Sequence, residues 1–446
     1  MADGPRVAIK TLGCKLNQYE SEQIREDFEA LGFQAVDFDQ PAEVYLINSC
    51  TVTHRTDRDT RRLSRQARRR QPEAMIIVTG CYVQMQPEVV EGLGVVDLVA
   101  RNERKGELAR AAAEWLEARG RLDAMPGGER DPQRLVSSFP DNTRAFVKVQ
   151  TGCNANCAYC IIRKARGPSR SIPPDLALRQ AERLALSGHP EVVLVGIHLG
   201  VYGHDLDEPG LDLDELTRRM CALEALPRLR LSSIEPMEIS DDLIAMVAAG
   251  GRALRPDPSL PGRGMLCRHL HIPMQSGCDE TLRRMRRPYD SASYGDVVRR
   301  VHEAEPLAAI GADVMTGFPG ETDEEFQQTE ALVRELPVSY LHVFTYSARP
   351  GTDAAEMPDQ VDPEVRKQRT HVLRALSRDK RRAFAERAVG ETLEVVVETP
   401  REEGRLSGIS DNYLRVAFEG SDELIGELVP VEITRARGAE AMGRLI

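Results

Sequence analysis

Three closely spaced cysteines that follow an apolar run constrain this fold more than any other feature of the sequence. Cys153, Cys157 and Cys160 are separated by three and then two residues, and they follow the strand-like run Ala145–Val149. Thiolates prefer iron–sulfur clusters, zinc or copper(I). A [4Fe–4S] cluster usually takes four cysteine ligands, so three cysteines would leave one iron open for a substrate or cofactor. The same run also fits part of a zinc site with a distant fourth ligand, or three thiols packed in a core.

Length and composition predict a cytosolic, multidomain protein. A chain of 446 residues holds roughly three domains, and its 41% hydrophobic and 29% charged residues indicate a soluble globular protein. It has no apolar run of about 18 residues and no apolar signal region near its start, so we expect no membrane partner. Nine cysteines in a reducing compartment favour metal binding or catalysis over disulfides.

Apolar, β-rich runs alternate with helical patterns over residues 6–122. Such alternation predicts an open parallel sheet with helices on its faces. The expected strands are Val7–Leu12, Val44–Asn48, Met75–Thr79 and Val95–Val99. The expected helices are Ser21–Leu31, Asp57–Arg70, Pro87–Leu93 and Lys105–Arg119.

A second set of cysteines follows the strands of this first sheet. Cys14, Cys50 and Cys81 each come two residues after one of the first three expected strands. Ligands of open α/β sheets bind at the carboxyl ends of the strands, so these thiols are expected to converge there. The alternative is chance, with three thiols in turns near a core. We favour a second three-cysteine cluster site.

The rest of the chain predicts two further domains. Six strands alternate with helices between residues 144 and 347, which predicts an open or partial (β/α) barrel with its active site at the carboxyl ends of the strands. These strands are Ala145–Thr151, Glu191–Ile197, Leu229–Ile234, His269–Pro273, Ile310–Phe318 and Tyr340–Tyr346. A long basic helix near Pro363–Ala388 precedes the last 55 or so residues, whose short strands Leu393–Glu398, Tyr413–Phe418 and Leu428–Thr434 predict a small β-barrel.

The boundaries follow from changes in composition. A turn-rich linker around Met125–Pro132 separates the first two domains, and Gly250–Gly264 is expected to be a proline-rich loop. We therefore predict an α/β chain with three domains: an open parallel α/β sheet (1–124), a partial (β/α)6 barrel (139–372) and an all-β barrel (386–446).

Charge is segregated along the chain. The net charge is −11, yet Arg55–Arg70 holds eight arginines against two aspartates, and Arg366–Arg387 holds nine lysines or arginines against two acidic residues. Each run is either a solvated helix face or part of a site for a polyanion. Residues 390–446 carry a net charge of −6. An RNA-binding barrel should be basic on at least one face. One possibility is that its arginines cluster on one face, namely Arg401, Arg405, Arg415, Arg435 and Arg437. The other is that RNA binds to the Arg366–Arg387 helix instead.

Several runs together resemble one enzyme family. They are Lys10–Ser21, Asn48–Thr53, Thr79–Tyr82, Cys153–Cys160, Arg163–Ser171 and Ala312–Thr322. The chain resembles the radical S-adenosylmethionine (SAM) methylthiotransferases from about Val7 to Thr434. Within that family, Cys50–His54, Gly196–Gly203 and Ser232–Pro236 are most similar to the group that acts on threonylcarbamoyl-adenosine next to the tRNA anticodon.

The resemblance implies cofactors and partners. It implies an auxiliary [4Fe–4S] cluster on Cys14, Cys50 and Cys81, a second [4Fe–4S] cluster on Cys153, Cys157 and Cys160 that binds SAM, and a C-terminal TRAM-type barrel. It also implies tRNA as substrate, a reducing donor such as flavodoxin or ferredoxin, a sulfur source and a cytoplasmic location. Sister groups act on isopentenyl-adenosine in tRNA or on an aspartate of a ribosomal protein.

Residues near the expected strand ends are candidates for SAM binding. Tyr159, between two cluster ligands, is expected to pack near the adenine. Gly196 offers bare backbone to the methionine end, and Glu235 is expected to accept the ribose hydroxyls, as an acidic residue does in dinucleotide sites. The ordinary alternatives are a core aromatic, a strand-end turn and a surface carboxylate.

Four weaker candidates complete the set. Gln275 and Asp313 follow or line later strands. Arg166 and Arg170 suit bidentate anion binding, either to the SAM carboxylate or to tRNA phosphates, and their alternative is a solvated loop. His54, His198, His269 and His271 are assigned to no metal, and Cys221, Cys267 and Cys278 are expected to be core or free thiols.

One rival belongs to another functional class. A non-enzymatic iron–sulfur or zinc protein that binds RNA would use its cysteines structurally. A structural zinc site is closed by four ligands, and neither cysteine set has an obvious fourth.

Overall fold

The computed structural model describes residues 4–122, 135–252, 265–402 and 404–446. The predicted linker Met125–Pro132 and the predicted loop beyond Arg252 lie outside these residues. The chain divides into two compact units. One comprises Met1–Val136, Gly152–Ala155 and Cys160–Pro168, and the other comprises Ser137–Thr151, Asn156–Tyr159 and Ser169–Ile446.

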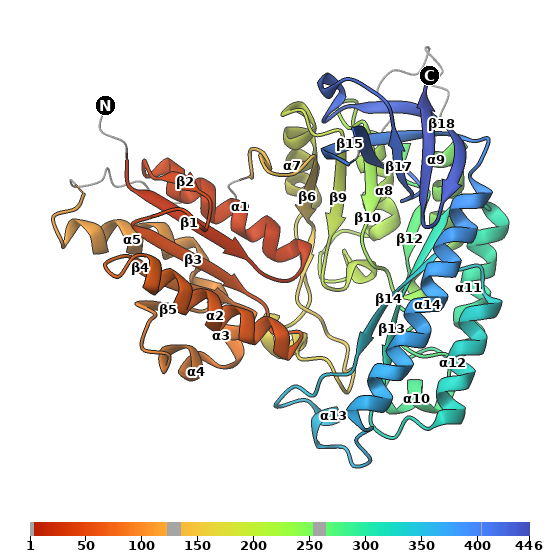
Figure 1. The fold of residues 1–446 in the computed structure, drawn as a ribbon, viewed down its shortest axis with the longest axis horizontal. Helices are drawn as coiled ribbons and strands as arrows, with labels where there is room; N and C mark the ends of the chain where they lie inside the picture. The colour runs from red at the N-terminus through yellow and green to blue at the C-terminus, as the bar shows by residue number, and fades with distance from the viewer. Residues whose placement is uncertain (1–3, 123–134, 253–264, 403) are drawn as a thin grey trace. The chain divides into compact units, whose positions relative to one another are not determined.

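A wholly parallel five-stranded sheet forms the first unit, in the order β2-β1-β3-β4-β5 (Figure 1). Every residue of β3 and β4 is buried, as expected for a parallel sheet covered on both faces. The strands are β1 (Arg6–Thr11), β2 (Gln34–Val36), β3 (Val44–Ser49), β4 (Met75–Gly80) and β5 (Leu98–Ala100). The helices are α1 (Lys15–Ala30), α2 (His54–Arg70), α3 (Cys81–Met85), α4 (Pro87–Glu91), the 3-10 helix η1 (Asn102–Glu107), α5 (Leu108–Glu117) and α6 (Ile162–Arg166).

The first sheet confirms the predicted alternation, with differences at the ends of elements. The three-residue strand β2 was not predicted, and α1 begins at Lys15 rather than Ser21. The strand expected at Val95 begins at Leu98. The reason is local: Gly94 is left-handed (φ +64°), and Arg68 binds both the Val95 carbonyl oxygen (3.2 Å) and the Asp97 carboxylate (2.5 Å) before the strand begins.

All six strands predicted for the second unit are present and parallel. β6 (Arg144–Lys148), β9 (Glu191–Val195), β10 (Arg228–Leu231) and the unpredicted edge strand β11 (Met265–Leu266) form one sheet, in the order β11-β10-β9-β6. β12 (His269–His271), β13 (Ala309–Thr316) and β14 (Tyr340–Thr345) form the next. A bridge between Ser233 and His271 joins the two sheets.

Helices connect these strands, and a short hairpin carries the cysteine loop. The hairpin pairs β7 (Gln150–Thr151) with β8 (Arg170–Ser171). The connecting helices are α7 (Pro174–Leu186), η2 (Leu199–Val201), α8 (Leu213–Cys221), η3 (Pro236–Glu238), α9 (Asp241–Arg252), α10 (Asp279–Arg284), α11 (Ser291–Ala304), α12 (Asp323–Glu335) and α13 (Asp353–Glu356). α14 (Pro363–Arg387) follows and packs along β14 (Figure 1).

A closed five-stranded barrel ends the chain, in the order β15-β16-β17-β19-β18. Three of its strands were predicted, while β16 and β19 were not. Its strands are β15 (Thr392–Glu402), β16 (Arg405–Ser410), β17 (Arg415–Phe418), β18 (Leu428–Arg437) and β19 (Glu440–Leu445), with a 3-10 turn η4 (Asp422–Leu424). Alternate apolar side chains fill it, among them Val395, Val416 and Val431, each fully buried.

Buried arginines fasten this barrel to the sheet that precedes it in the same unit. Arg228 and Arg230 pair with Glu191 at 2.6 and 2.7 Å and also donate to backbone carbonyl oxygens of residues 394, 409, 410 and 411. Burial alone would raise the pKa of Glu191, but the guanidinium groups of Arg230 and Arg228 hold it well below its ordinary value. Among the described residues, no helix is both long and apolar enough to cross a membrane.

Candidate functional site

The carboxyl ends of β1, β3 and β4 are clamped together by side chains of the first motif. Asn17 donates to the carbonyl oxygens of Leu12 (2.7 Å) and Ser49 (3.0 Å), while Asn48 donates to the Asn17 carbonyl oxygen (3.0 Å). The Ser49 hydroxyl donates to the Thr79 carbonyl oxygen (2.5 Å). These bonds fix the spacing of the backbones that carry Cys14, Cys50 and Cys81.

Glycines in the left-handed region precede three of the six cysteines. They are Gly13 (φ +94°), Gly80 (φ +99°) and Gly152 (φ +74°). A Cβ on Gly13 would lie 2.7 Å from the sulfur of Cys50, and one on Gly80 would lie 2.3 Å from the Ser49 carbonyl oxygen. Both the backbone conformation and the close approach therefore require glycine at these positions.

The thiols of Cys14, Cys50 and Cys81 lie close enough to interact electrostatically. Burial is the main cause that raises the pKa of Cys50 to about 11, and the charges of Cys81 and Cys14 act in the same direction. Burial also raises the pKa of Cys81, opposed by the positive charges of Arg166 and Lys105. Metal ligation requires the thiolate form, so these cations favour the ligating state of Cys81.

Arg166 lies in this first site rather than in solvent. Its guanidinium group binds Glu20 at 2.7 Å and the side-chain oxygen of Asn17 at 2.5 Å, and only 3% of its side chain is exposed. Lys105 binds the same Glu20 carboxylate at 2.5 Å. The predicted contact of Arg166 with SAM or with phosphates remains a prediction. Arg170 is exposed on β8 and makes no side-chain bond among the described residues.

The second cysteine set lies in the loop between β7 and β8. The Cys153 amide donates to the Gly167 carbonyl oxygen (3.1 Å), and the sulfur of Cys153 accepts from the Ala155 amide (3.4 Å). Further along, the Ala158 amide donates to the Met285 carbonyl oxygen (3.0 Å).

A buried arginine that the sequence did not point to binds Cys157. Arg287 donates to the sulfur of Cys157 at 3.2 Å, pairs with the carboxylate of Glu235, and places its guanidinium carbon 4.9 Å from the centre of the Tyr289 ring. Its side chain is 5% exposed. Burial would lower the pKa of Arg287, but the negative charges of its neighbours raise it, so the group stays cationic. Burial raises the pKa of Glu235, and Arg287 partly offsets this.

Tyr159, Gly196 and Gln275 are placed as follows. The Tyr159 ring packs edge-on against Phe318, with ring centres 6.3 Å apart, within an apolar cluster. Gly196 follows β9, where a Cβ would lie 3.0 Å from the side-chain oxygen of Gln150. Gln275 is buried, adopts φ +60° and bridges to Val314 of β13. Their contacts with SAM remain predictions.

Asp313 lies at the centre of a polar cluster on three neighbouring strands. Its carboxylate is 3.0 Å from Nε2 of His271 and 3.5 Å from Nδ1 of His342. Burial would raise the pKa of Asp313, but hydrogen bonds from these two imidazoles hold it well below its ordinary value. The Tyr340 hydroxyl lies 3.3 Å from Nδ1 of His271 and 2.8 Å from Nε2 of His269.

The described side chains include one group with the tight spacing of a single-ion site. The donor atoms of His271, Asp313 and His342 all lie within 4.8 Å of one another, and no cysteine set in the described residues is gathered so closely. Cys267 and Cys278 are buried and Cys221 is partly buried, as expected for core thiols.

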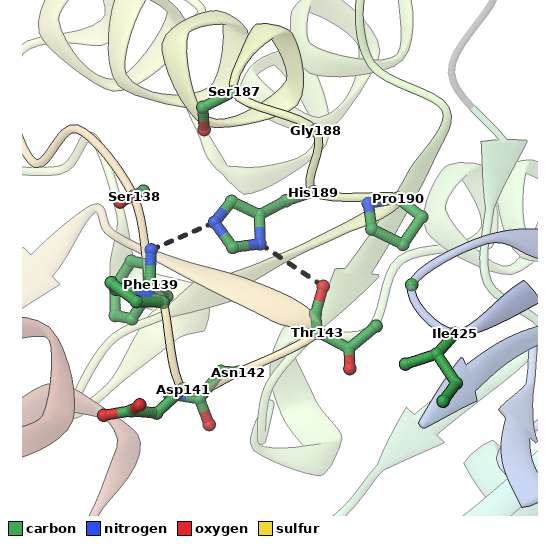
Figure 2. Close-up of a pocket in the computed structure, with 12 residues that line it drawn as sticks. Ser138, Phe139, Asp141, Asn142, Thr143, Ser187, Gly188, His189, Pro190 and Ile425 are labelled. Atoms are coloured by element: carbon green, nitrogen blue, oxygen red, sulfur yellow. Dashed lines mark hydrogen bonds between the residues drawn. The ribbon is translucent and has the colours of Figure 1, made fainter. Parts of the chain in front are cut away.

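A pocket of about 360 Å³ lies at the opposite ends of the barrel strands. His189, just before β9, accepts a hydrogen bond from the Phe139 amide at Nε2 (3.0 Å), so its Nδ1 donates to the Thr143 carbonyl oxygen (3.3 Å) (Figure 2). Burial lowers the pKa of His189. Because the cysteines follow the carboxyl ends of the strands, this pocket is not the site that they predict.

Three family models match successive parts of the chain. They are "Uncharacterized protein family UPF0004" over residues 6–100, the radical SAM superfamily over 147–333 and the TRAM domain over 386–446. A threonylcarbamoyladenosine tRNA methylthiotransferase, MtaB, of Bacillus subtilis is 39% identical over 96% of this chain and 94% of its own. The chain belongs to the radical-SAM methylthiotransferase family.

Other relatives agree with this membership. The MtaB of Aquifex aeolicus is 36% identical over 96% of this chain and all of its own length. A tRNA-2-methylthio-N(6)-dimethylallyladenosine synthase of Pelotomaculum thermopropionicum is 32% identical over 98% of this chain and 97% of its own. This chain is therefore a radical-SAM methylthiotransferase, an enzyme of an iron–sulfur superfamily.

A solved structure supports the fold. The radical SAM methyltransferase TsrM from Kitasatospora setae, with cobalamin and a [4Fe–4S] cluster bound, aligns with a TM-score of 0.54 at 15% identity. The alignment covers 79% of this chain and 77% of that one.

Several residues of the two sites were missed from sequence. Arg287, His342 and Lys105 belong to no motif with recognisable spacing, and their charged or sulfur partners are 29 or more residues away in the chain. Asn17 and Glu20 lie inside the quoted run Lys10–Ser21, so their positions were signalled although their roles were not.

Proposed function

We propose that this chain adds a methylthio group to the adenine ring of threonylcarbamoyl-adenosine next to the anticodon of tRNA. In this proposal it uses SAM and two [4Fe–4S] clusters, one on Cys14, Cys50 and Cys81 and one on Cys153, Cys157 and Cys160. The printed names of the relatives that are 34–39% identical to this chain support the substrate.

The observation that carries the proposal is the convergence of three thiols at one edge of the first sheet. Cys14, Cys50 and Cys81 come from three separate strand ends that Asn17, Asn48 and Ser49 tie together. Three thiols leave one iron of a [4Fe–4S] cluster without a cysteine ligand. A second three-cysteine run on the same chain gives the enzyme two such positions.

The number of ligands favours clusters over zinc. A structural zinc site is closed by four ligands, and neither set of three cysteines has an obvious fourth ligand in the sequence. Visible absorbance and iron content after anaerobic purification test this preference, because zinc is colourless.

The reaction divides between cofactor and protein. When bound, a cluster with SAM supplies a radical that attacks a C–H bond, which side-chain acids and bases do not readily activate. The chain's own residues bind and orient. Arg287 holds a positive charge against Cys157, and Glu235, held by Arg287, is positioned to accept hydroxyl groups. Lys105 and Arg166 hold positive charge near Cys81.

The remaining partners are part of the same proposal. The reaction needs an electron donor such as flavodoxin or ferredoxin and a sulfur source, and it takes place in the cytoplasm with the tRNA. We propose these from the family resemblance alone.

Mass spectrometry of tRNA nucleosides tests the proposal. The host is a bacterium that lacks its own methylthiotransferases, with and without this protein. We expect a new methylthio-threonylcarbamoyl-adenosine peak that depends on the protein. A methylthio-isopentenyl-adenosine peak would instead support the substrate of the dimethylallyladenosine relatives. Neither peak, with intact clusters, would overturn the tRNA substrate in favour of a ribosomal-protein or non-enzymatic role.

Single substitutions separate the two sites. Cys153→Ala is expected to abolish cleavage of SAM to deoxyadenosine, whereas Cys14→Ala should spare that cleavage and stop sulfur transfer. Loss of SAM cleavage in Cys14→Ala, with the remaining iron retained, would contradict separate roles for the two sites.

A further inference from the structure

Helix α2 presents an uninterrupted row of arginines to solvent. Its exposed arginines are spaced by three and four residues in alternation, which keeps them on one face of a helix with 3.6 residues per turn. They are Arg55, Arg58, Arg62, Arg65 and Arg69. The row spans about 21 Å at 1.5 Å per residue. The opposite face, with Thr60, Leu63 and Ala67, is buried against the sheet.

The other three arginines of α2 are occupied within the first unit. Arg61 donates to the Tyr82 hydroxyl (2.7 Å), Arg68 pairs with Asp97 (2.5 Å), and Arg70 donates to the Phe38 carbonyl oxygen (2.5 Å). These contacts give the arginines at positions 61, 68 and 70 a structural role. They give no such role to the five arginines of the exposed row.

The positive charge of the exposed arginine row is balanced by few acidic side chains. Arg55 and Arg62 share Asp59 at 3.8 and 3.6 Å, which is a weak surface pairing. Arg58, Arg65 and Arg69 make no ion pair or hydrogen bond within the described ranges. Like charges three and four residues apart destabilise a helix. The fold itself therefore gains nothing from this row, and an external polyanion would neutralise it.

The row begins beside the proposed auxiliary cluster site. α2 starts four residues after Cys50, and the hydroxyl of Thr51, the residue that follows Cys50, donates to the carboxylate of Asp57 in the first turn of the helix (3.0 Å). A polyanion that follows the row toward His54 is therefore led to Cys50 within the same unit.

The chemistry of the row fits phosphates on a nucleic acid. Guanidinium groups bind phosphate oxygens in a bidentate manner, and no apolar stripe for a membrane surface lies among them. By contrast, residues 390–446, which include the TRAM match, carry a net charge of −6, while His54–Arg70 carry +6.

We propose that the exposed row Arg55–Arg69 of α2 binds the tRNA sugar–phosphate backbone and directs the substrate toward Cys50. This inference rests on the proposed function, because it takes tRNA as the substrate. It assigns a substantial share of tRNA affinity to the first unit rather than to the C-terminal barrel.

Salt-dependent binding by the anaerobically reconstituted holoenzyme tests this inference. The probe is tRNA purified from the host that lacks methylthiotransferases, and its Kd is measured across a KCl series. The triple variant Arg58→Gln/Arg65→Gln/Arg69→Gln is compared with the charge-matched control Arg179→Gln/Arg299→Gln/Arg334→Gln, whose exposed arginines lie on α7, α11 and α12.

We expect the α2 variant to bind tRNA about 10- to 100-fold more weakly near 0.1 M KCl, because it loses phosphate contacts. Each lost contact lowers the magnitude of the slope of log K against log salt by about 1, so this magnitude should fall by about 2 to 3. SAM cleavage should not change, and Arg→Lys at the three positions should restore the slope. The control should bind like wild type.

Three results would overturn the inference, and they are distinguishable. If wild type binds and methylthiolates tRNA while the α2 variant keeps the wild-type Kd and slope, the row is not the tRNA surface and the proposed function stands. If wild type neither binds nor modifies tRNA, both fail. Loss of binding to anionic phospholipid vesicles, with tRNA binding intact, would reassign the row to a membrane surface.

Discussion

At the scale of single residues, Arg287 connects two predicted functions. It touches both a predicted cluster ligand, Cys157, and the predicted ribose acceptor, Glu235. Hydrogen bonds and charges at cluster sulfurs set reduction potentials. A buried cation stabilises the more negative, reduced cluster more than the oxidised one. We therefore propose that Arg287 positions Cys157 and Glu235 and that it raises the reduction potential of the proposed barrel cluster.

Arg287→Gln is expected to lower the reduction potential of the barrel cluster. A differential interaction of about 1.4 kcal/mol corresponds to about 59 mV for a one-electron couple, so we expect a shift on the order of 60 mV toward more negative values. Potentiometric titration monitored by electron paramagnetic resonance of the Cys14→Ala protein measures it, because only the barrel cluster is then complete.

The neighbouring Arg286 supplies the control for this measurement. Its side chain is 43% exposed and pairs with Asp353 rather than with a cysteine. Arg286→Gln should leave the potential unchanged, and Arg287→Lys should restore part of the shift. An unchanged potential in Arg287→Gln would show that this contact does not tune the cluster.

At the scale of elements, the ends of three strands form the first site. Parallel pairing alone brings β1, β3 and β4 to one edge, but the hydrogen bonds of Asn17 set their relative positions. Asn17 also binds Arg166, so its loss would leave this buried cation close to Cys81 with Glu20 as its remaining side-chain partner.

Asn17→Ala is therefore expected to impair assembly of the first cluster selectively. The carbonyl oxygens of Leu12 and Ser49 would lose their partner, at a cost of roughly 1–3 kcal/mol for each buried group. Iron content after anaerobic reconstitution should fall from eight toward four per chain, with SAM cleavage retained. Gln18→Ala, one residue further along the same helix, is the control. Full iron loading in Asn17→Ala would contradict the clamp.

Sequence patterns predicted the helices and strands better than the side-chain contacts between them. All six barrel strands and the alternation of the first sheet follow from runs such as Val44–Ser49, which is buried throughout, and Ala309–Thr316, which is buried except at Asp313. Short strands such as β2 and β19 were missed because their side chains are mostly exposed or partly buried. Arg166 illustrates the limit: its type predicted an anion partner, but only the fold reveals that Glu20 fills that role.

The same limit applies to the candidate site. Local sequence is enough to predict the two cysteine sets as ligands, because it contains both the ligand spacing and the strand ends, and this assignment stays a prediction. The contact of Arg287 with Glu235 was not predictable, because it joins the loop after α10 to the loop after β10, 52 residues apart in the chain. Likewise, the row on α2 was visible as a run of arginines, yet which of them are free depends on Asp97, Tyr82 and Phe38 elsewhere in the fold.

At the scale of the whole molecule, a buried charge cluster links the barrel sheet to the C-terminal β-barrel. Glu191 is fully buried between Arg228 and Arg230, and both arginines also cap carbonyl oxygens of β15 and β16 or the turn after β16. Removing one partner from such a cluster leaves an uncompensated buried charge, which destabilises more than the intact pair stabilises. Glu191 thus contributes to the attachment of the C-terminal barrel, together with the pairs Arg268–Asp411 and Arg144–Glu398.

Glu191→Gln should destabilise the second unit by roughly 3–5 kcal/mol near pH 7. The direction in which stability changes with pH follows from the lowered pKa of Glu191 in the folded chain. Its ionised form contributes stability above its unfolded pKa near 4.5, and that stability is lost as the pH falls below this value. The difference between wild type and Glu191→Gln should therefore shrink steadily below pH 4.5.

Thermal unfolding midpoints, with hydrogen–deuterium exchange of peptides from β15 and β16, measure this effect. Exchange in those strands should rise in Glu191→Gln before exchange in β13 does, because the arginines that cap their carbonyl oxygens lose their counter-charge. Glu432→Gln is the control, since Glu432 pairs with Arg444 on the surface, where such pairs contribute at most about 1 kcal/mol. Equal, pH-independent midpoints for wild type and Glu191→Gln would mean that other contacts hold the barrel in place.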